Sequence, residues 1–304
     1  MVKFFRKRPY ILFILPAFLM YSIFIIYPLA FVVPYSFTSW SGFGPMEFAG
    51  LQNFRIIFQN EIVVGQLKNA FGNIMYRLFL NYSITHPIII TFAYLIYRKM
   101  FGAGFIKTVV FMPNFADYVA IAFMVSLFFS PSFGLYGTFM KAIGLEKYAI
   151  AGIWSKPSLG VPLTVLVACW KTIGYDLLLY IAAFNSVPVE MDESAKIDGA
   201  GELRRFFNIY MPLSMPAITN ILILQYIHSL LSFDASYMLG SINGGIRGCM
   251  DTLMLFFYRN VFDGGYASNF VGMGSAFSMV IVIPVVIGTL LLQFLLKKFK
   301  EGVE

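Results

Sequence analysis

Polar side chains interrupt the long apolar runs of this 304-residue sequence, and they are the residues whose types could do chemistry. The first candidates are Asp117, Tyr118, Lys171, Asp176, Gln225, His228 and Asp234. A charged group is costly inside hydrocarbon, so such residues line a polar path or pair between helices. Arg77 and His86 allow the same two interpretations. We predict a polar pathway built from the first set, with interhelical pairing as the alternative for each residue.

The spacing of these residues indicates which of them can act together. Lys171 and Asp176 are five positions apart, which is about 140° of net rotation on a helix. We therefore do not expect these two side chains to pair. Gln225 and His228 are three positions apart and share a helical face.

No catalytic constellation is visible in the sequence. It lacks the P-loop pattern G-x-x-x-x-G-K-[ST] and the nucleophile pattern G-x-S-x-G. Two histidines and two cysteines give no metal-ligand spacing. We predict that the chain is not an enzyme and binds neither a metal nor a cofactor of its own.

The composition indicates an integral membrane protein. Hydrophobic residues make up 59% of the chain and charged residues 12%, whereas a soluble domain is nearer 45–50% apolar. The net charge of +7 could suggest a nucleic-acid partner. The positive residues instead cluster at the ends of hydrophobic runs, as in membrane proteins, and we predict no nucleic-acid binding.

The hydrophobic runs predict an all-α protein with six membrane spans. The predicted spans are residues 10–35, 67–97, 108–129, 160–185, 213–239 and 269–296. Thirteen of the twenty-two Lys and Arg residues lie in the segments that this arrangement places inside. The positive-inside rule therefore predicts that both termini are cytoplasmic, and the whole chain, 1–304, is interpreted as one membrane domain.

Residues 187–212 form the most charged stretch of the sequence, and the predicted topology places them on the cytoplasmic side. It carries eight charges between Pro188 and Met211, so it lies in water between spans 4 and 5. Its pattern predicts a helix that ends at Asp198–Gly201, followed by a second short helix. The second helix is expected to be apolar on one side and closed by two prolines, through Leu203, Phe206, Phe207 and Tyr210, then Pro212 and Pro216.

This stretch resembles the EAA motif of ABC importer permeases. The resemblance rests on Glu193-Ser194-Ala195, Asp198-Gly199-Ala200, Phe206, Ile209 and the prolines, with Ser194 and Met211 as departures. In that family the loop forms coupling helices that fit a groove on an ATPase. The resemblance implies coupling roles for Glu193, Ala195, Asp198, Gly199, Ala200 and Arg204. Glu193 is then expected to meet an ATPase arginine, and Gly199 to allow the tight turn.

Three further segments resemble carbohydrate permeases of the maltose and glycerol-phosphate kind. They are FAGLQNFRIIF at 48–58, FFSPSFGLYGTFMKAIGL at 128–145 and MLGSINGGIRGCMDTLMLFFYRNVF at 238–262. The chain looks like the first of the two membrane subunits of such importers. The resemblance implies a carbohydrate substrate, expected to be an oligosaccharide, and the basic residues Arg77, Lys171 and His228 permit an acidic one.

The resemblance also implies the partners and the mechanism. A second related permease would complete a heterodimer, two cytoplasmic ATPase subunits would bind ATP and Mg, and an extracytoplasmic solute-binding protein would deliver the sugar. The complex would lie in the bilayer of the bacterial cytoplasmic membrane and work by alternating access. The alternative is a self-contained secondary transporter or channel, which would have no need of a docking loop.

Overall fold

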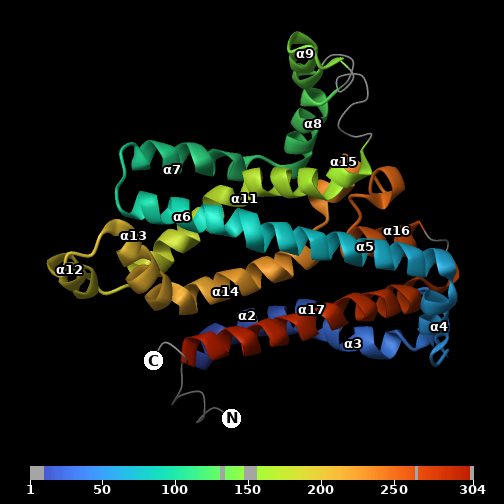
Figure 1. The fold of residues 1–304 in the computed structure, drawn as a ribbon. Helices are drawn as coiled ribbons and strands as arrows, with labels where there is room; N and C mark the ends of the chain where they lie inside the picture. The colour runs from blue at the N-terminus through green and yellow to red at the C-terminus, as the bar shows by residue number, and fades with distance from the viewer. Residues whose placement is uncertain (1–9, 131–133, 147–155, 264–265, 302–304) are drawn as a thin grey trace. The chain divides into compact units, whose positions relative to one another are not determined.

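The computed structural model describes residues 10–130, 134–146, 156–263 and 266–301, which are mostly helical (Figure 1). The chain forms two compact units. The first comprises the described residues up to Val64 together with Phe257–Pro284, and the second comprises Gly65–Phe256 and the described residues from Val285 onward.

The elements follow one another in a simple order. The first unit contains α2 (Tyr10–Tyr21), η1 (Ser22–Ile26), α3 (Tyr27–Tyr35), β1 (Thr38–Ser39), β2 (Glu47–Phe48), α4 (Gln52–Gln59) and η8 (Ala267–Asn269). The second contains η2 (Asn81–Thr85), α6 (His86–Tyr97), α7 (Ala103–Phe111), η3 (Met112–Phe115), α8 (Tyr118–Phe128), α9 (Leu135–Ala142), η5 (Pro157–Leu159), α11 (Gly160–Asn185), α12 (Val189–Ile197), α13 (Glu202–Arg205), η6 (Phe206–Tyr210), α14 (Met211–Leu230), α15 (Asp234–Gly240) and η7 (Ile246–Gly248). Helices α5 (Glu61–Leu80), α16 (Leu253–Phe262) and α17 (Phe270–Glu301) run across the division.

Five helical stretches in the described part of the chain are long and apolar enough to cross a membrane. They are Phe13–Tyr35, Glu61–Tyr97, Pro157–Asn185, Glu202–Gly240 and Phe270–Leu295. Each coincides with a predicted span, so the chain is a multi-pass membrane protein. The predicted second and fifth spans are embedded in longer helices than expected.

The predicted third span, residues 108–129, is not one continuous helix. The stretch Ala103–Phe115 meets Tyr118–Phe128 at an angle of 100°. Counted as one broken span, the pair gives up to six crossings among the described residues. The break has a local cause, because Asp117 adopts an extended conformation and its side chain accepts a hydrogen bond from the Val119 amide as the N-cap of α8.

Three of the spans contain a widened, π-helical turn that ends two positions before a proline. The pairs are Ser22–Ile26 with Pro28, Asn81–Thr85 with Pro87, and Phe206–Tyr210 with Pro212. Proline donates no hydrogen bond and its ring displaces the carbonyl four residues earlier. A wider turn accommodates this and lets the helix continue. The prediction that Pro212 and Pro216 close the second short helix is therefore wrong, since α14 continues to Leu230.

Within the first unit, two asparagines fix the segment after the first span. Asn53 is buried and donates to the carbonyls of Ser36 and Thr38, each at 2.9 Å. Asn269 donates to the Asn53 side-chain oxygen at 2.8 Å and accepts from the Trp40 amide at 2.9 Å. Asn53 thus holds together a turn that pairs β1 with β2 and ties it to the start of α17.

Within the second unit, α6, α11 and α14 pack around a cluster of aromatic side chains. Tyr94 lies edge-on to Phe184, at 5.7 Å between ring centroids, and to Tyr210, at 5.2 Å. Tyr180 and Phe206 are buried in the same cluster. This aromatic cluster lies where α6 ends and where α12 and α13 begin, and Figure 1 shows these elements at one end of the unit.

Helix α11 also passes very close to α7. A Cβ atom added to Gly174 would lie 2.5 Å from the Phe111 Cα and 2.7 Å from the Val110 carbonyl oxygen. Small residues allow such close approach of membrane helices. Gly174 therefore fixes the distance between α7 and α11.

Candidate functional site: an intramembrane cavity and a charged loop

The second unit contains a cavity of about 300 Å³ between its long helices. Five of the seven predicted pathway residues line it: Tyr118, Asp176, Gln225, His228 and Asp234. Arg77 and His86 line it as well. Because hydrogen-bonding groups from four helical stretches converge here, the cavity is suited to a ligand rich in hydroxyl groups.

The carboxylate of Asp176 is the best-organised group of this cavity. It is buried, accepts a hydrogen bond from the Gln225 side-chain amide, and lies 3.4 Å from the Thr172 hydroxyl. Gln225 and His228 line the same cavity, as their predicted shared face requires. The Gln225 amide, which is a neutral donor on α14, therefore orients one carboxylate oxygen of Asp176 toward that helix.

Lys171 and Asp117 do not line the cavity. The Lys171 ammonium donates to the backbone carbonyls of Ala116, at 2.6 Å, and Asn114, at 3.3 Å, and lies 4.8 Å from the centre of the Tyr118 ring. The absence of pairing between Lys171 and Asp176 agrees with their predicted angular separation. Lys171 satisfies the carbonyls that the break before α8 leaves open, and Asp117 caps α8, so both stabilise the broken span.

Arg77 is the buried cation of the cavity. Its guanidinium donates to the hydroxyl of Thr164 at 2.9 Å and lies 3.4 Å from that of Ser236. His86 lies 3.0 Å from the Tyr180 hydroxyl. The sequence allowed either a pathway role or a packing role for Arg77 and His86. In the structure both residues line the cavity, and the hydrogen-bond partners of both are neutral.

The charged loop 187–212 folds as a helix, a turn and a helix, as predicted. Helix α12 ends at Ile197, and Gly199 has a φ of +75°, a value that disfavours side chains. Of the predicted coupling residues, Glu193, Asp198, Gly199 and Arg204 are exposed, and Ala195 and Ala200 are half-buried. The side chains of Glu193 and Arg204 form no ion pair in the part of the chain that the structure describes.

The apolar residues of the second short helix do not share one side. Phe206 and Tyr210 are buried, whereas Leu203 and Phe207 are 75% and 64% exposed. The π-helical turn Phe206–Tyr210 rotates the following residues away from the expected register. On α12, Val189 and Ile197 lie four positions before and after Glu193 and are exposed, so the outer face of the loop presents apolar side chains beside this acidic residue.

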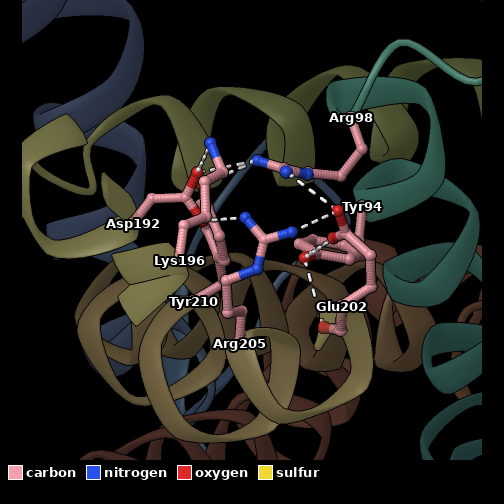
Figure 2. A network of polar contacts seen from close by, with 7 residues as sticks. All are labelled: Tyr94, Arg98, Asp192, Lys196, Glu202, Arg205 and Tyr210. Carbon is pink, nitrogen blue, oxygen red and sulfur yellow. Dashed lines mark hydrogen bonds and ion pairs between the residues drawn. The ribbon is translucent and has the colours of Figure 1, made fainter. Parts of the chain in front are cut away.

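Beneath that face lies a network of ion pairs that sequence reasoning missed (Figure 2). Asp192 is at its centre, with a side chain only 5% exposed. It accepts from Arg98 at 3.0 Å, from Arg205 at 2.8 Å and from Lys196 at 2.8 Å. Burial disfavours ionisation of Asp192, but the hydrogen bonds from these three cations outweigh burial and lower its pKa to about 2.

Glu202 closes this network into a ring. Arg98 donates to Glu202 at 2.9 Å, and Arg205 donates to the same oxygen. The Tyr94 hydroxyl donates to the other Glu202 oxygen at 2.9 Å, and Arg98 also donates to the Tyr210 hydroxyl at 3.3 Å. Both arginines therefore bridge the two carboxylates, which belong to α12 and α13. The mixture of acidic and basic residues in the loop is the signal that could have suggested pairing within it, but Arg98 lies 94 positions from Asp192.

Comparison of the sequence with known proteins identifies a family and several relatives. Residues 62–303 match the family described as "Binding-protein-dependent transport system inner membrane component". The probable ABC transporter permease protein YurN of Bacillus subtilis is 28% identical over 300 residues, 97% of each chain. The probable starch degradation products transport system permease protein AmyD of Thermoanaerobacterium thermosulfurigenes is 28% identical over 302 residues, again 97% of each. The sn-glycerol-3-phosphate transport system permease protein UgpA of Pectobacterium atrosepticum is 30% identical over 292 residues, 94% of this chain and 92% of the relative.

Solved structures share the fold. A chain of a bacterial ABC transporter involved in the import of the acidic polysaccharide alginate matches with a TM-score of 0.74 at 22% identity, over 96% of both chains. A chain of the bacterial alginate transporter in complex with an alginate pentasaccharide-bound periplasmic protein matches with a TM-score of 0.75 at 22% identity, over 97% of this chain and 96% of that one. The relatives are transport components rather than catalytic enzymes. The chain belongs to the family of inner membrane components of binding-protein-dependent transport systems.

Proposed function

We propose that this chain is one membrane subunit of an ATP-driven importer that carries a carbohydrate, specifically an oligosaccharide, across the bacterial cytoplasmic membrane. A solute-binding protein would deliver the sugar on the outside. A second, related permease and two ATPase subunits would complete the complex. Both ends of the chain and the loop 187–212 would lie in the cytoplasm, because the basic residues concentrate there.

The observation that carries this proposal is the loop 187–212. Its inner side is fixed by the ring of Arg98, Asp192, Arg205 and Glu202. Its outer side presents Glu193 and exposed apolar side chains. An element braced by ion pairs on one side, with an exposed face of mixed apolar and acidic character on the other, suits docking to another protein. A self-contained transporter or channel has no use for such an element.

The cavity supports the choice of a carbohydrate. Its lining combines carboxylate, amide, imidazole and guanidinium groups with the Tyr118 and Tyr175 rings. These groups can exchange hydrogen bonds with hydroxyls, and the rings offer faces for the apolar side of a sugar. ATP-driven closure of the ATPase subunits would move the loop, and the spans would rock to expose the cavity to one side and then the other.

Arg77 supports an acidic oligosaccharide as the second candidate substrate. This buried guanidinium has hydroxyl partners and no carboxylate partner among the described residues. A uronic acid carboxylate could accept from it bidentately. Uptake of labelled neutral and uronic oligosaccharides of equal length by the same complex separates the two. Uptake of the neutral sugar alone would exclude the acidic class.

Co-purification tests the docking role. The chain is expressed with its partner permease and the candidate ATPase, as wild type, Gly199→Arg and Gly199→Asn. Gly199 has no neighbour within 4 Å of an added Cβ, so a long side chain projects outward at the turn. Asparagine tolerates positive φ and serves as the matched control.

We expect the ATPase to co-purify with wild type and Gly199→Asn and to be lost with Gly199→Arg, while the two permeases stay associated. Recovery of the ATPase with all three variants would show that the turn is not part of the docking surface. If no ATPase is recovered even with wild type, the importer proposal itself fails.

A further inference from the structure

We infer that Arg98 is a positioning residue that transmits movement of the loop 187–212 to the second span. The inference rests on the proposed docking role of that loop. Arg98 follows directly after α6, whereas all other charged members of the network belong to α12 and α13 (Figure 2). It is therefore the one ion-pair connection, among the described residues, between the loop and a helix that is not its covalent neighbour.

The covalent connections of the loop explain why a further connection matters. The chain joins α12 to α11 through Ser186–Pro188, and α13 continues into α14. A displacement of the loop therefore reaches the fourth and fifth spans through the backbone. The second span has no such route and depends on side-chain contacts with the loop.

The geometry of Arg98 suits it to this task. One guanidinium nitrogen donates to Asp192 at 3.0 Å and the other to Glu202 at 2.9 Å, so a single planar group bridges both helices of the loop. Tyr94, one turn earlier on α6, adds a hydrogen bond to Glu202. The side chains of Arg98 and Asp192 are 22% and 5% exposed, so solvent screens this ion pair less than it would on an open surface.

The helix that Arg98 terminates leads directly to the cavity. The stretch Glu61–Tyr97 is one long helix, and Arg77, Asn81 and His86 on it line the cavity. Asn81 is 17 residues before Arg98, or about 25 Å along a helix. A rigid element of this kind carries a displacement at one end to the other, which is the physical requirement for coupling.

The test uses the complete complex in proteoliposomes, with the binding protein and sugar outside. The variants are Arg98→Gln, Arg98→Lys and Lys196→Gln. Lys196 is the matched control because it pairs with the same Asp192 carboxylate from within α12, so its loss leaves the connection to α6 intact. Three quantities are measured: ATPase recovered with the permease pair, ATP hydrolysed, and sugar taken up.

We expect Arg98→Gln to recover as much ATPase as wild type but to take up about tenfold less sugar per ATP hydrolysed. Arg98→Lys should be intermediate, because an ammonium is a point charge and cannot bridge two carboxylates in one plane. Lys196→Gln should resemble wild type. A ratio for Arg98→Gln within twofold of wild type would overturn the inference.

Two outcomes distinguish this inference from simpler explanations. If Arg98→Gln loses the ATPase as Gly199→Arg is expected to, Arg98 merely maintains the shape of the docking face and the transmission role is refuted. If wild type recovers no ATPase, the proposed function fails and this inference fails with it. Lower uptake with normal docking is the result that only a transmitting residue gives.

A local readout at the cavity completes the test. The two native cysteines are first removed, Cys169 by replacement with serine and Cys249 by replacement with alanine. Thr85→Cys then places a single thiol of this chain on the cavity wall. In the wild-type context we expect its rate of maleimide labelling to change when a non-hydrolysable ATP analogue is added. With Arg98→Gln that change should disappear, and its persistence would refute the inference.

Discussion

Replacing Gly174 with alanine should push apart two helices of the second unit. The added Cβ would lie 2.5 Å from the Phe111 Cα and 2.7 Å from the Val110 carbonyl oxygen. Carbon atoms in contact prefer about 3.5–4.0 Å, so α7 and α11 must separate by about 1 Å. Both obstacles are backbone atoms, and no side-chain rotation can relieve the contact. Overpacking of this kind costs about 1–3 kcal/mol.

The assay is thermal unfolding of the purified permease pair, with Gly72→Ala as the matched control. Gly72 is an exposed glycine of helix α5 with no atom within 4 Å of an added Cβ. Alanine there should be neutral or stabilising, because glycine in a helix interior costs about 1 kcal/mol relative to alanine. Gly174→Ala should lower the midpoint by several degrees, since about 1 kcal/mol corresponds to roughly 2–4 °C in larger domains.

The same variant should impair transport, because α11 also carries Tyr175 and Asp176, which line the cavity, and a displaced α11 moves them. A midpoint for Gly174→Ala equal to or above that of Gly72→Ala would refute the close packing of α7 on α11. A lowered midpoint with normal uptake would show that a displacement of about 1 Å at this contact does not reach the cavity.

Three further predictions concern single polar groups. Asp117→Ala should destabilise the start of α8 by about 1 kcal/mol through loss of its N-cap, seen as faster hydrogen exchange over Val119–Ile121, whereas Asp117→Ser should not. Lys171→Met should lower the thermal midpoint, because the carbonyl of Ala116 loses its donor; an unchanged midpoint would mean that water replaces the ammonium fully. The pKa of Asp192 is lowered to about 2, so this carboxylate contributes its stability above about pH 4 and loses it as the pH falls toward 2. Pepsin cleavage of wild type in the loop 187–212 should therefore rise as the pH falls from 4 to 2. In Asp192→Asn, cleavage should be high at every pH in that interval.

The parts of the molecule that the sequence predicted correctly depend on local chemistry. The glycines at positions 199 and 201 predicted a turn that ends the first helix of the loop, and the structure has this turn, with Gly199 at a φ of +75°. The angular separation of Lys171 and Asp176 predicted that they would not pair, and their partners lie on different elements. The separate runs of apolar residues were sufficient to predict the five long spans of the described residues.

The errors arose where distant or non-periodic effects decide the structure. The broken third span is apolar enough on average to pass as one helix, so hydropathy did not predict the bend, although Pro113, Asn114 and Asp117 interrupt the apolar run where the bend occurs. The π-helical turn Phe206–Tyr210 shifts the residues after it out of phase with those before it, which a period of 3.6 does not describe. Arg98 and Asp192 meet across 94 positions, and nothing in one sequence links residues so far apart.

The widened turn in the second span has a consequence for how chain length may vary in this helix. A π-helical turn holds one residue more than the α-helical turn it replaces, so deleting one residue between Asn81 and Thr85 would convert it to a regular turn. Because the widened turn makes about the same rotation with one residue more, the later side chains would keep their angular positions, and His86 would stay at the cavity wall. Deleting one residue from the regular helix between His86 and Tyr97 would instead turn every later side chain by about 100° around the axis, and Arg98 would face away from Asp192. The widened turn is therefore the place where this span can lose one residue without losing the rotational alignment of its two ends.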